Sequence, residues 1–528
     1  MHCIGGQWRI GTVLSLVLFI LGLASASAAP SVIRINVGFE PDSLDPHVSA
    51  TTSAGEIDLQ LFTALTEFDV NGKISPGVAK SWEASPDGLT YTFHLRPDFT
   101  WSDGTPMTAS DWVWSFQRLE SPKTYSERAV FYYDVVNARA VSTKNADPAT
   151  LGIRAIDPMT VEFRLEAPNP HFPELLAGFY PVPRKDFETY GAAWVKPEHF
   201  VGNGPYVLTG YSPHVRVDLA RNPHYPSDRR PAYDTVIVYI TPEAMSGLLR
   251  YRAGGLDIVA LSSAEFARIP PEHQGELHIY PAANVTYLTL NPKSGPLSDM
   301  RVRKALSLTI DRDLIAHKVL GAGAVPMNLI LYDAWTGLTG QKPPDDSMRP
   351  PTERTALAVN LLKAAGYGPS HRVQFTIMCS GEIAMRVCVQ LQSTWKPLGV
   401  DVQIQTAEAT GLFADLDAGD FDAAISGYAM GQQKDPLPSL AAFEDGGMFD
   451  FTHRALPVFN TAVDAARMEK DPMVRAAKVA EAEHILLSDW SIVPLVAQPG
   501  RYLIAPTVTG WNTHAAPVAL RFFSPSRS

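Results

Sequence analysis

The chain has 528 residues, of which 45% are hydrophobic and 19% are charged, and its formal net charge is −11. This composition is typical of a well-packed globular protein. One core rarely organises more than about 250–300 residues, so we expect two or more domains. An acidic chain without a basic stripe argues against nucleic acid and anionic lipid as partners.

The N-terminal segment predicts export. Arg9 is followed by an apolar run over 10–23 and by an A-x-A pattern that ends at Ala28. We therefore expect residues 1–28 to be a cleaved signal peptide rather than an uncleaved anchor. Cys3 precedes the apolar run, so it is not the lipid-carrying cysteine of a lipoprotein. No later segment approaches about 18 uninterrupted apolar residues, which predicts a soluble mature protein outside the cytoplasm.

Short runs in which apolar and polar residues alternate predict strands with one buried and one solvated face. They lie at 33–37, 91–95, 161–165 and 215–219. Two further runs, at 236–240 and 286–290, are more continuously apolar or β-prone and predict central strands.

Three predicted helices have readable ends. Thr108, Asp299 and Thr352 are their expected N-caps, because a hydroxyl or carboxylate there can accept a free amide of the first turn. Gly366 is expected to end the third helix. Strands and helices are mixed over the whole length, which predicts an α/β fold.

Two cysteines remain after the expected cleavage, Cys379 and Cys388. Export to an oxidising compartment favours a disulfide between them. Cys379 ends a predicted strand and Cys388 lies in a predicted helix, so Cys388 can equally be a small buried hydrophobe. The sequence leaves both alternatives open.

Motifs for catalysis and metal binding are missing from the sequence. There is no G-x-S-x-G elbow, H-E-x-x-H pair, C-x-x-C pair or phosphate loop, and the histidines do not pair at metal-ligand spacing. We expect neither enzymatic activity nor a metal or other cofactor. A hydrolase with scattered catalytic residues is the rival hypothesis.

An ordered set of motifs resembles the family 5 extracellular solute-binding proteins of ABC importers. The string P-G-V-A-K-S-W at 76–82 is followed by P-D-G-L-T-Y-T-F-H-L-R at 86–96 and W-S-D-G-T-P at 101–106. Further matches lie at 40–46, 108–111, 202–206, 221–225, 299–306, 311–312 and 492–494. They follow the family's order over essentially the whole mature chain. The chain is more similar to the oligopeptide binders than to the dipeptide binders.

The resemblance implies a bilobed periplasmic binding protein of type II with three domains. Domain I would combine residues 29–62, 187–281 and 497–528, domain II would be 63–186, and domain III would be 282–496. The two lobes would close on a peptide or peptide-like ligand, without enzymatic activity. A monomer would then deliver the ligand to an inner-membrane permease with cytoplasmic ATPases. A chaperone role is left open.

In the oligopeptide binders, the ligand lies extended and its backbone pairs with two protein segments. By the order of the motifs, these segments correspond here to Ala50, Thr51 and Thr52 and to Gly427, Tyr428 and Ala429. Backbone pairing gives affinity without reading side chains, so the resemblance implies low specificity.

Several positions depart from the family pattern. The family's ammonium-binding aspartate corresponds to Gly431 in a loop that is one residue longer here, so either Asp435 takes its role or the anchor is lost. Asp435 precedes a proline, and capping a turn is the alternative role. An arginine is replaced by Ile425, a tryptophan by Ala409 and a tyrosine by Arg128.

These replacements imply a roomier cleft with different charges. Arg128 can hold a ligand carboxylate or phosphate, or it can be a solvated loop residue. A modified peptide, a cell-wall fragment or another small polar conjugate therefore becomes an alternative ligand.

Overall fold

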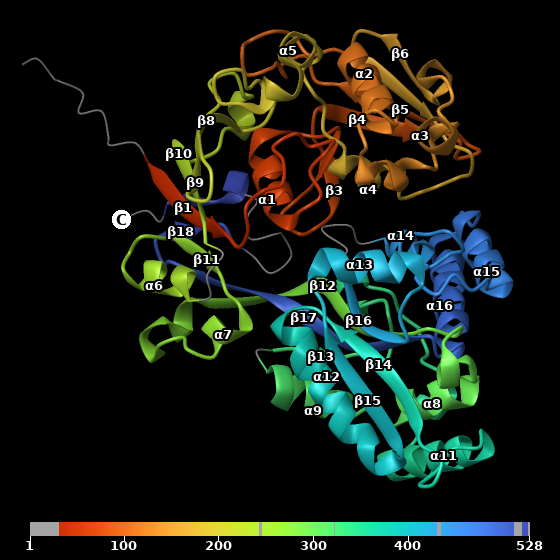
Figure 1. Ribbon diagram of the computed structural model, residues 1–528. Helices are drawn as coiled ribbons and strands as arrows, with labels where there is room; N and C mark the ends of the chain where they lie inside the picture. Colours follow the sequence, from red (N-terminus) through yellow and green to blue (C-terminus); the bar gives the residue numbers. More distant parts are fainter. Residues whose placement is uncertain (1–30, 242–244, 322, 430–434, 512–519, 526–528) are drawn as a thin grey trace, which may run out of the picture.

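The computed structural model describes residues 31–241, 245–321, 323–429, 435–511 and 520–525. These residues form two lobes of mixed helices and strands (Figure 1). One lobe contains two four-stranded sheets, and the other contains most of a seven-stranded sheet. The predicted bilobed α/β fold is confirmed.

The part corresponding to the expected domain I is built around a four-stranded sheet. Its elements are β1 (Val32–Val37), α1 (Thr52–Leu61), α5 (Arg184–Tyr190), β8 (Tyr206–Ser212), β9 (Arg216–Arg221), β10 (Thr235–Ile240), α6 (Ser246–Arg252), β11 (Ile258–Ala260), α7 (Ser263–Phe266), β18 (Val508–Thr509) and β19 (Ser524–Pro525). The sheet order is β1-β10-β9-β8, with β1 and β10 parallel. Ile33 and Ile35 of β1 share a core with Val236 and Val238 of β10 and with Ile57 of α1.

A second four-stranded sheet, of order β4-β5-β7-β6 and antiparallel throughout, lies within the residues expected for domain II. Its elements are β2 (Thr66–Phe68), β3 (Ile74–Pro76), β4 (Ala79–Ala84), β5 (Thr90–Leu95), α2 (Ala109–Glu120), α3 (Ala138–Lys144), β6 (Ile153–Asp157), β7 (Thr160–Arg164) and α4 (Phe172–Leu175). The predicted capping box begins α2, and Trp112 and Phe116 of α2 are fully buried against the sheet. Phe179 still packs in the core of this sheet, whereas Tyr180 packs in the core around β1 and β10. The change lies close to the expected domain boundary at 186.

The other lobe is organised by the seven-stranded sheet. Its elements are β12 (Leu277–Leu290), α8 (Met300–Leu308), α9 (Arg312–Leu314), β13 (Val325–Pro326), α10 (Asp333–Thr336), α11 (Pro351–Ala364), β14 (Val373–Cys379), α12 (Gly381–Trp395), β15 (Val400–Thr406), α13 (Ala409–Ala418), β16 (Ala423–Ala429), α14 (Pro436–Ala441), α15 (Pro457–Arg467), α16 (Pro472–Ser488) and β17 (Ile492–Ile504). The order is β11-β17-β12-β16-β14-β15, and β13 pairs with β17. Cys379 of β14 and Cys388 of α12 form a disulfide, which ties the strand to the helix that covers it.

Two long strands connect the lobes. β12 and β17 pair antiparallel from Leu277↔Leu503 in the first lobe to Thr289↔Ile492 in the second. Their register shifts between Tyr280 and Asn284 and again between Thr286 and Tyr287. The expected domain boundaries at 281/282 and 496/497 therefore fall inside continuous strands.

Most predicted element ends agree with the structure, and one differs. Asp299 caps α8 by accepting a bond of 2.8 Å from the amide of Arg301. The predicted cap at Thr352 is wrong, because α11 already begins at Pro351. Proline is favoured at the first helical position, where its missing N–H has no helical partner to lose. Within the described ranges, no helix combines the length and apolar character that a membrane crossing requires.

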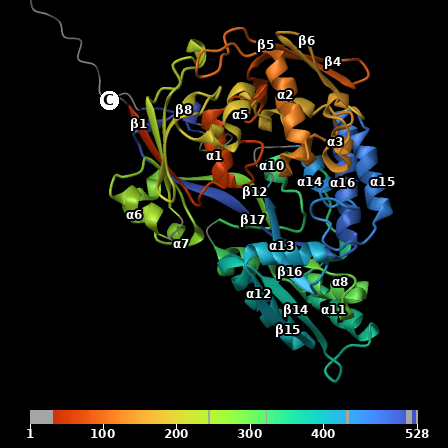
Figure 2. The ribbon, with the colours of Figure 1, turned by 45° about the horizontal axis from the view of Figure 1, so that its top comes forward.

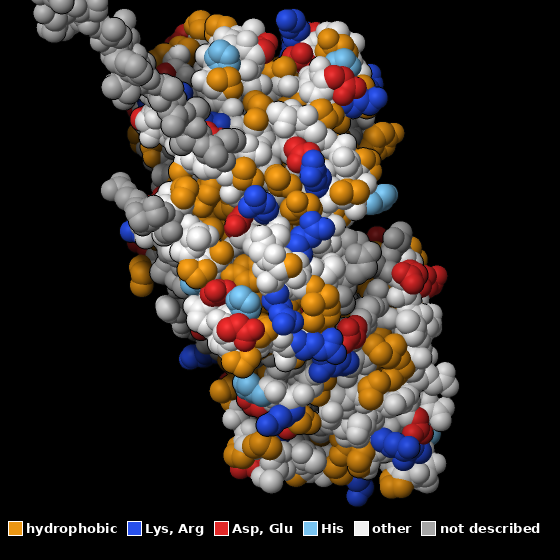
Figure 3. Space-filling model, turned by 90° about the vertical axis from the view of Figure 1, so that its left-hand side faces the viewer, with side chains coloured by type: hydrophobic (Ala, Val, Ile, Leu, Met, Phe, Trp, Pro, Cys, Tyr) orange, Lys and Arg blue, Asp and Glu red, His pale blue; other side chains and the backbone are white. Residues whose placement is uncertain are grey.

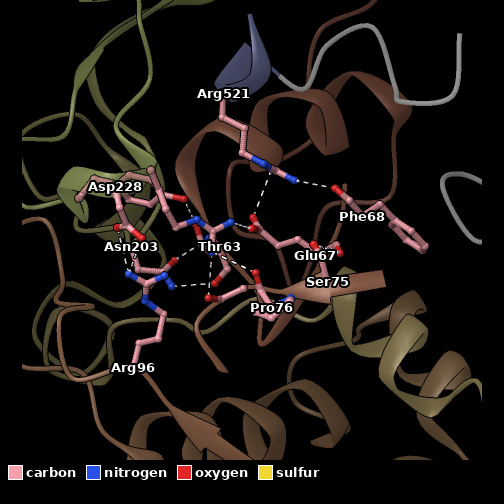
Figure 4. A network of polar contacts seen from close by, with 12 residues as sticks. Thr63, Glu67, Phe68, Ser75, Pro76, Arg96, Asn203, Asp228 and Arg521 are labelled. Atoms are coloured by element: carbon pink, nitrogen blue, oxygen red, sulfur yellow. Dashed lines mark hydrogen bonds and ion pairs between the residues drawn. The ribbon is translucent and has the colours of Figure 1, made fainter. Parts of the chain in front are cut away.

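A network of charged residues, here called the seam, joins domains I and II (Figure 4). The Glu67 carboxylate pairs with Arg229 and with Arg521, whose Nη1 lies 3.3 Å from Oε1. Arg96 donates two bonds of 3.0 Å to Asp228. The side chains of Glu67 and Arg521 are nearly buried, so these charges of the seam lie inside the protein.

Candidate ligand-binding site

The segment from Ala50 to Thr52 is held in place by Asp42. The Asp42 carboxylate accepts bonds of 2.8 Å from the Ala50 amide and 2.7 Å from the Thr51 hydroxyl. Thr51 is the N-cap of α1, and its hydroxyl oxygen accepts from the Ala54 amide at 3.3 Å. Burial raises the pKa of Asp42, but these bonds outweigh it and leave the pKa below its usual value. Ala50 and Thr52 remain exposed.

Arg128 lies directly beside this segment. Its Nε donates a bond of 2.8 Å to the Ser49 carbonyl, and a Cβ added at Gly55 would lie 3.9 Å from its Nη2. In the part of the chain that the structure describes, neither terminal nitrogen of Arg128 has a hydrogen-bond or ion-pair partner. The guanidinium is therefore oriented against the first turn of α1, with both terminal nitrogens still available.

A buried polar layer supports the segment from behind. Asp45 accepts from Arg118 Nη1 at 3.0 Å and from Trp194 Nε1 at 3.1 Å. His47 Nε2 lies 2.9 Å from the Tyr180 carbonyl, to which it donates. Burial and the Arg118 charge lower the pKa of His47 to about 4, so it is neutral at neutral pH. The E-P-D-S-L-D-P motif thus builds the support of the site.

The second segment, Gly427 to Ala429, lies in β16. These three residues pair with Thr286, Val285 and Asn284 of β12, respectively. On its other side, β16 pairs with β14 only through Ala423 and Ala424. Among the described strands, nothing pairs with the β14-facing edge from 425 to 429. Gly427 is exposed. The edge is therefore suitable for main-chain bonds from an added extended segment.

Two predicted contacts in β16 have side chains that belong to the core. Tyr428 is buried beside Tyr287 and Phe443, and its hydroxyl donates a bond of 2.5 Å to the Ile330 carbonyl. Ile425 is buried on the other face of the sheet. These side chains are therefore occupied in packing, which leaves the backbone as the means of contact at both positions.

For Asp435, the structure shows the capping alternative. Its carboxylate accepts from Arg475 Nη1 at 2.9 Å and Nη2 at 3.0 Å, and from the Leu437 amide at 3.1 Å. Asp435 is the N-cap of α14 and is 1% exposed. Both oxygens thus serve the far lobe itself. Ala409 is the first residue of α13, and Gly431 lies outside the described residues.

Glu56 is a cleft candidate that the sequence did not single out. It lies one helical turn after Thr52, on the same face of α1. Burial raises the pKa of Glu56 to about 8. Ile57, the next residue of α1, shares a core with Tyr502 of β17, and Tyr280 of β12 packs against that core, so Glu56 lies near the strands that cross between the lobes. An acidic residue early in a helix is ordinary, so the sequence carried no signal for it.

The lobes also approach each other at the edge formed by α3, α4, α14, α15 and α16 (Figures 1 and 2). Asn169 donates a bond of 2.8 Å to Asp134 of the first lobe. Burial raises the pKa of Asp134, and the charges of Arg467 and Arg475 from the second lobe oppose that rise. Charged groups of the two lobes therefore act on one another across this edge.

The charges on one face of the molecule are mixed in sign. Basic and acidic side chains are interspersed over the face in Figure 3, without a continuous basic stripe there. Among the residues that the structure describes, no three His, Cys, Asp or Glu side chains are grouped as metal ligands would be.

Comparisons with known proteins identify the family. The family model "Bacterial extracellular solute-binding proteins, family 5 Middle" matches residues 73–449. The chain is 32% identical to the Escherichia coli probable deoxycholate-binding periplasmic protein YgiS, over 96% of each chain. It is also 32% identical to the Haemophilus influenzae periplasmic oligopeptide-binding protein OppA, over 91% of this chain and 90% of that one.

Solved structures give the same result. Haemophilus influenzae OppA in complex with RPPGFSPFR has a TM-score of 0.82 at 31% identity, and covers 94% of this chain and 99% of its own. The Escherichia coli murein tripeptide binding protein MppA has a TM-score of 0.84 at 30% identity, and covers 95% of this chain and 99% of its own. The family resemblance predicted from the motifs is confirmed.

Proposed function

Because the chain belongs to family 5 of the bacterial extracellular solute-binding proteins, we propose that it captures a peptide or peptide-like solute between its lobes for an ABC importer. The ligand lies extended, with its backbone against 50–52 of α1 and 427–429 of β16. Arg128 binds a carboxylate or phosphate of the ligand. The chain releases the ligand unchanged, without a catalytic step.

The observation that carries the proposal is the unpaired edge of β16. An extended ligand pairs there through main-chain N–H and C=O groups, as an added strand pairs with a sheet. The exposed Gly427 lets a ligand backbone come close, because no side chain stands in the way. Relatives described as oligopeptide-binding and murein peptide-binding support the ligand class.

The test is calorimetry of the mature protein against a di- to pentapeptide library, together with mass spectrometry of any ligand that copurifies. We expect binding by several peptides of different sequence. Peptides with N-methylated backbone amides should bind weakly, because each methyl group removes a main-chain donor. Recovery of a bound peptide after prolonged incubation should show it intact. Cleavage would favour the hydrolase alternative.

A non-peptide anionic solute is the second candidate. Two observations favour it: Arg128 has available terminal nitrogens, and Asp435 is committed to Arg475. A relative described as probably deoxycholate-binding is consistent with an anion of this kind. This candidate would be favoured if no peptide of the library binds and if the copurified ligand is an anion without a peptide bond.

We also propose that a monomer in the periplasm works with an inner-membrane permease and cytoplasmic ATPases. Relatives named as periplasmic and as parts of an oligopeptide ABC transporter support this assignment. Permease genes next to the coding gene, and loss of solute uptake when either is deleted, would agree with it. Uptake that is unaffected by both deletions would contradict it.

A further inference from the structure

The described structure contains one carboxyl group between the lobes that has no protein partner. Glu56 lies on the face of α1 that also carries Thr52, and it is only partly exposed. No hydrogen bond or ion pair to its side chain is formed within the part of the chain that the structure describes. A carboxylate in such a place is costly unless a cation joins it.

Two tyrosines of the crossing strands pack with α1: Tyr502 shares a core with Ile57, the residue after Glu56, and Tyr280 packs against that core. Tyr280 and Tyr502 have ring centroids 5.6 Å apart, and their hydroxyls are hydrogen-bonded to each other. Burial raises the pKa of Tyr280 to about 12 and that of Tyr502 well above its usual value, so both remain neutral. Electron-rich rings beside a carboxylate form a favourable environment for an ammonium group.

The carboxyl groups of Asp58 and Asp435 accept hydrogen bonds within the protein. Asp58, on the same helix, accepts a bond of 3.0 Å from the Ser49 hydroxyl. Burial raises the pKa of Asp58 to about 7, and the charge of Arg128, which lies against Gly55, opposes that rise, whereas no cation opposes the rise at Glu56. Asp435 is held by Arg475 in the far lobe. Glu56 is thus the carboxyl group beside the proposed ligand segments that a ligand cation can join.

We infer that Glu56, with the rings of Tyr280 and Tyr502, binds the ammonium group of the ligand. This inference rests on the proposed function and adds a recognition rule to it: the ligand carries a free amine. The site accepts the amine beside the crossing strands, and not in the far lobe. Arg128 on the neighbouring side of α1 then meets an acidic group of the same ligand.

The first test is a competition between two libraries of the same tri- to pentapeptides, one with free and one with acetylated amino termini, both without lysine. The mature protein should retain free-amine peptides roughly tenfold or more over their acetylated partners. Equal retention of both libraries would overturn the inference and leave the proposed function intact. Retention of neither would contradict the proposed function itself.

Variants separate a binding role from a structural one. Glu56→Gln should abolish the preference for free amines, and Glu56→Asp should restore part of it. Glu198→Gln, which changes an exposed carboxylate in the stretch between α5 and β8, is the matched control and should behave like the parent protein. A Glu56→Gln variant that is folded and keeps the full preference would overturn the inference.

Proton release supplies a second readout. The raised pKa keeps Glu56 mostly protonated at pH 7, and an ammonium partner stabilises the ionised form. Calorimetry in buffers of different ionisation enthalpy should show release of about one proton per free-amine peptide bound at pH 7. Glu56→Gln should release none. Equal proton release by both proteins would contradict the assignment.

Discussion

Charged groups lie both in the seam and in the interlobe region around α1, but the two regions differ in whether these charges are paired within the protein. In the seam, Glu67 is matched by Arg229 and Arg521. Beside α1, Glu56 and the terminal nitrogens of Arg128 have no partner among the described residues. Charges that pair within the protein hold two parts of the chain together, whereas charges without a protein partner can pair with an added ligand. The comparison predicts that mutations in the two regions affect different measurements.

The largest effect is expected in the seam. Glu67→Gln removes the negative charge between two arginines, of which Arg521 is nearly buried. Breaking a buried pair in this way should lower the free energy of unfolding by about 3–5 kcal/mol. Urea denaturation followed by tryptophan fluorescence measures it.

The matched control for the seam is Glu198→Gln, which changes an exposed carboxylate. It should alter stability by less than about 0.5 kcal/mol. A loss below about 1 kcal/mol for Glu67→Gln would mean that the seam is no stronger than a surface ion pair.

Asp435→Asn should have the second largest effect on stability. The variant keeps the size of the cap and one bond to Arg475 but leaves that arginine buried without its counter-charge. We expect a loss of about 2–3 kcal/mol in unfolding free energy, with ligand affinity changed less than about twofold. Unchanged stability with a large loss of peptide affinity would reverse the assignment and return Asp435 to the ligand site.

The pH dependence of stability tests Glu56 without a ligand. Its pKa is about 8 in the folded protein and ordinary in the unfolded chain, so the folded state holds more protons between about pH 4.5 and 8. The contribution of Glu56 to the free energy of unfolding is therefore fully present below that pH range and is lost as the pH rises through it.

Glu56→Gln removes this titration. Relative to the parent protein, the variant should gain about 1–2 kcal/mol between pH 5 and pH 8, after allowance for screening of a partly exposed group. Thermal unfolding at the two pH values measures the difference. A parallel pH dependence of the two proteins would contradict the raised pKa.

The smallest expected effect is at Arg128. Arg128→Lys keeps the charge but loses the planar fork and the bond to Ser49, so a ligand carboxylate should bind roughly five- to tenfold more weakly. Peptides with amidated C-termini should bind the variant and the parent equally. The control is Arg386→Lys, on an exposed face of α12. If peptides with free and with amidated C-termini lose the same affinity in the variant, Arg128 does not bind the ligand carboxylate.

The sequence predicted much of the fold, because local signals agreed with the tertiary structure. Strand alternation placed β1, β5 and β9, and the cap residues Thr108 and Asp299 mark real helix starts. Thr352 failed because two prolines before it provide an earlier start. The continuity of β12 and β17 across the lobes was missed, since domain boundaries inferred from a resemblance do not report strand length.

The candidate site was less predictable, because its properties depend on contacts between distant segments. Nothing near Asp435 in the sequence indicates that Arg475, 40 residues later, binds its carboxylate. Glu56 looks like an ordinary acidic residue of the second turn of a helix until β12 and β17 come beside it. The segment 50–52 was assigned from its position shortly after the motif at 40–46 and stays a prediction, whereas the buried bonds of that motif to Arg118 and Trp194 could be found only in the folded structure.

The pair of crossing strands also limits how the lobes can move. β12 and β17 are bonded to each other on both sides of the irregular stretch between Tyr280 and Asn284. Bending at that stretch costs few ladder bonds, whereas sliding one strand along the other would break the ladder in both lobes. A relative motion of the lobes is therefore expected to bend the strand pair at this stretch rather than to shear it.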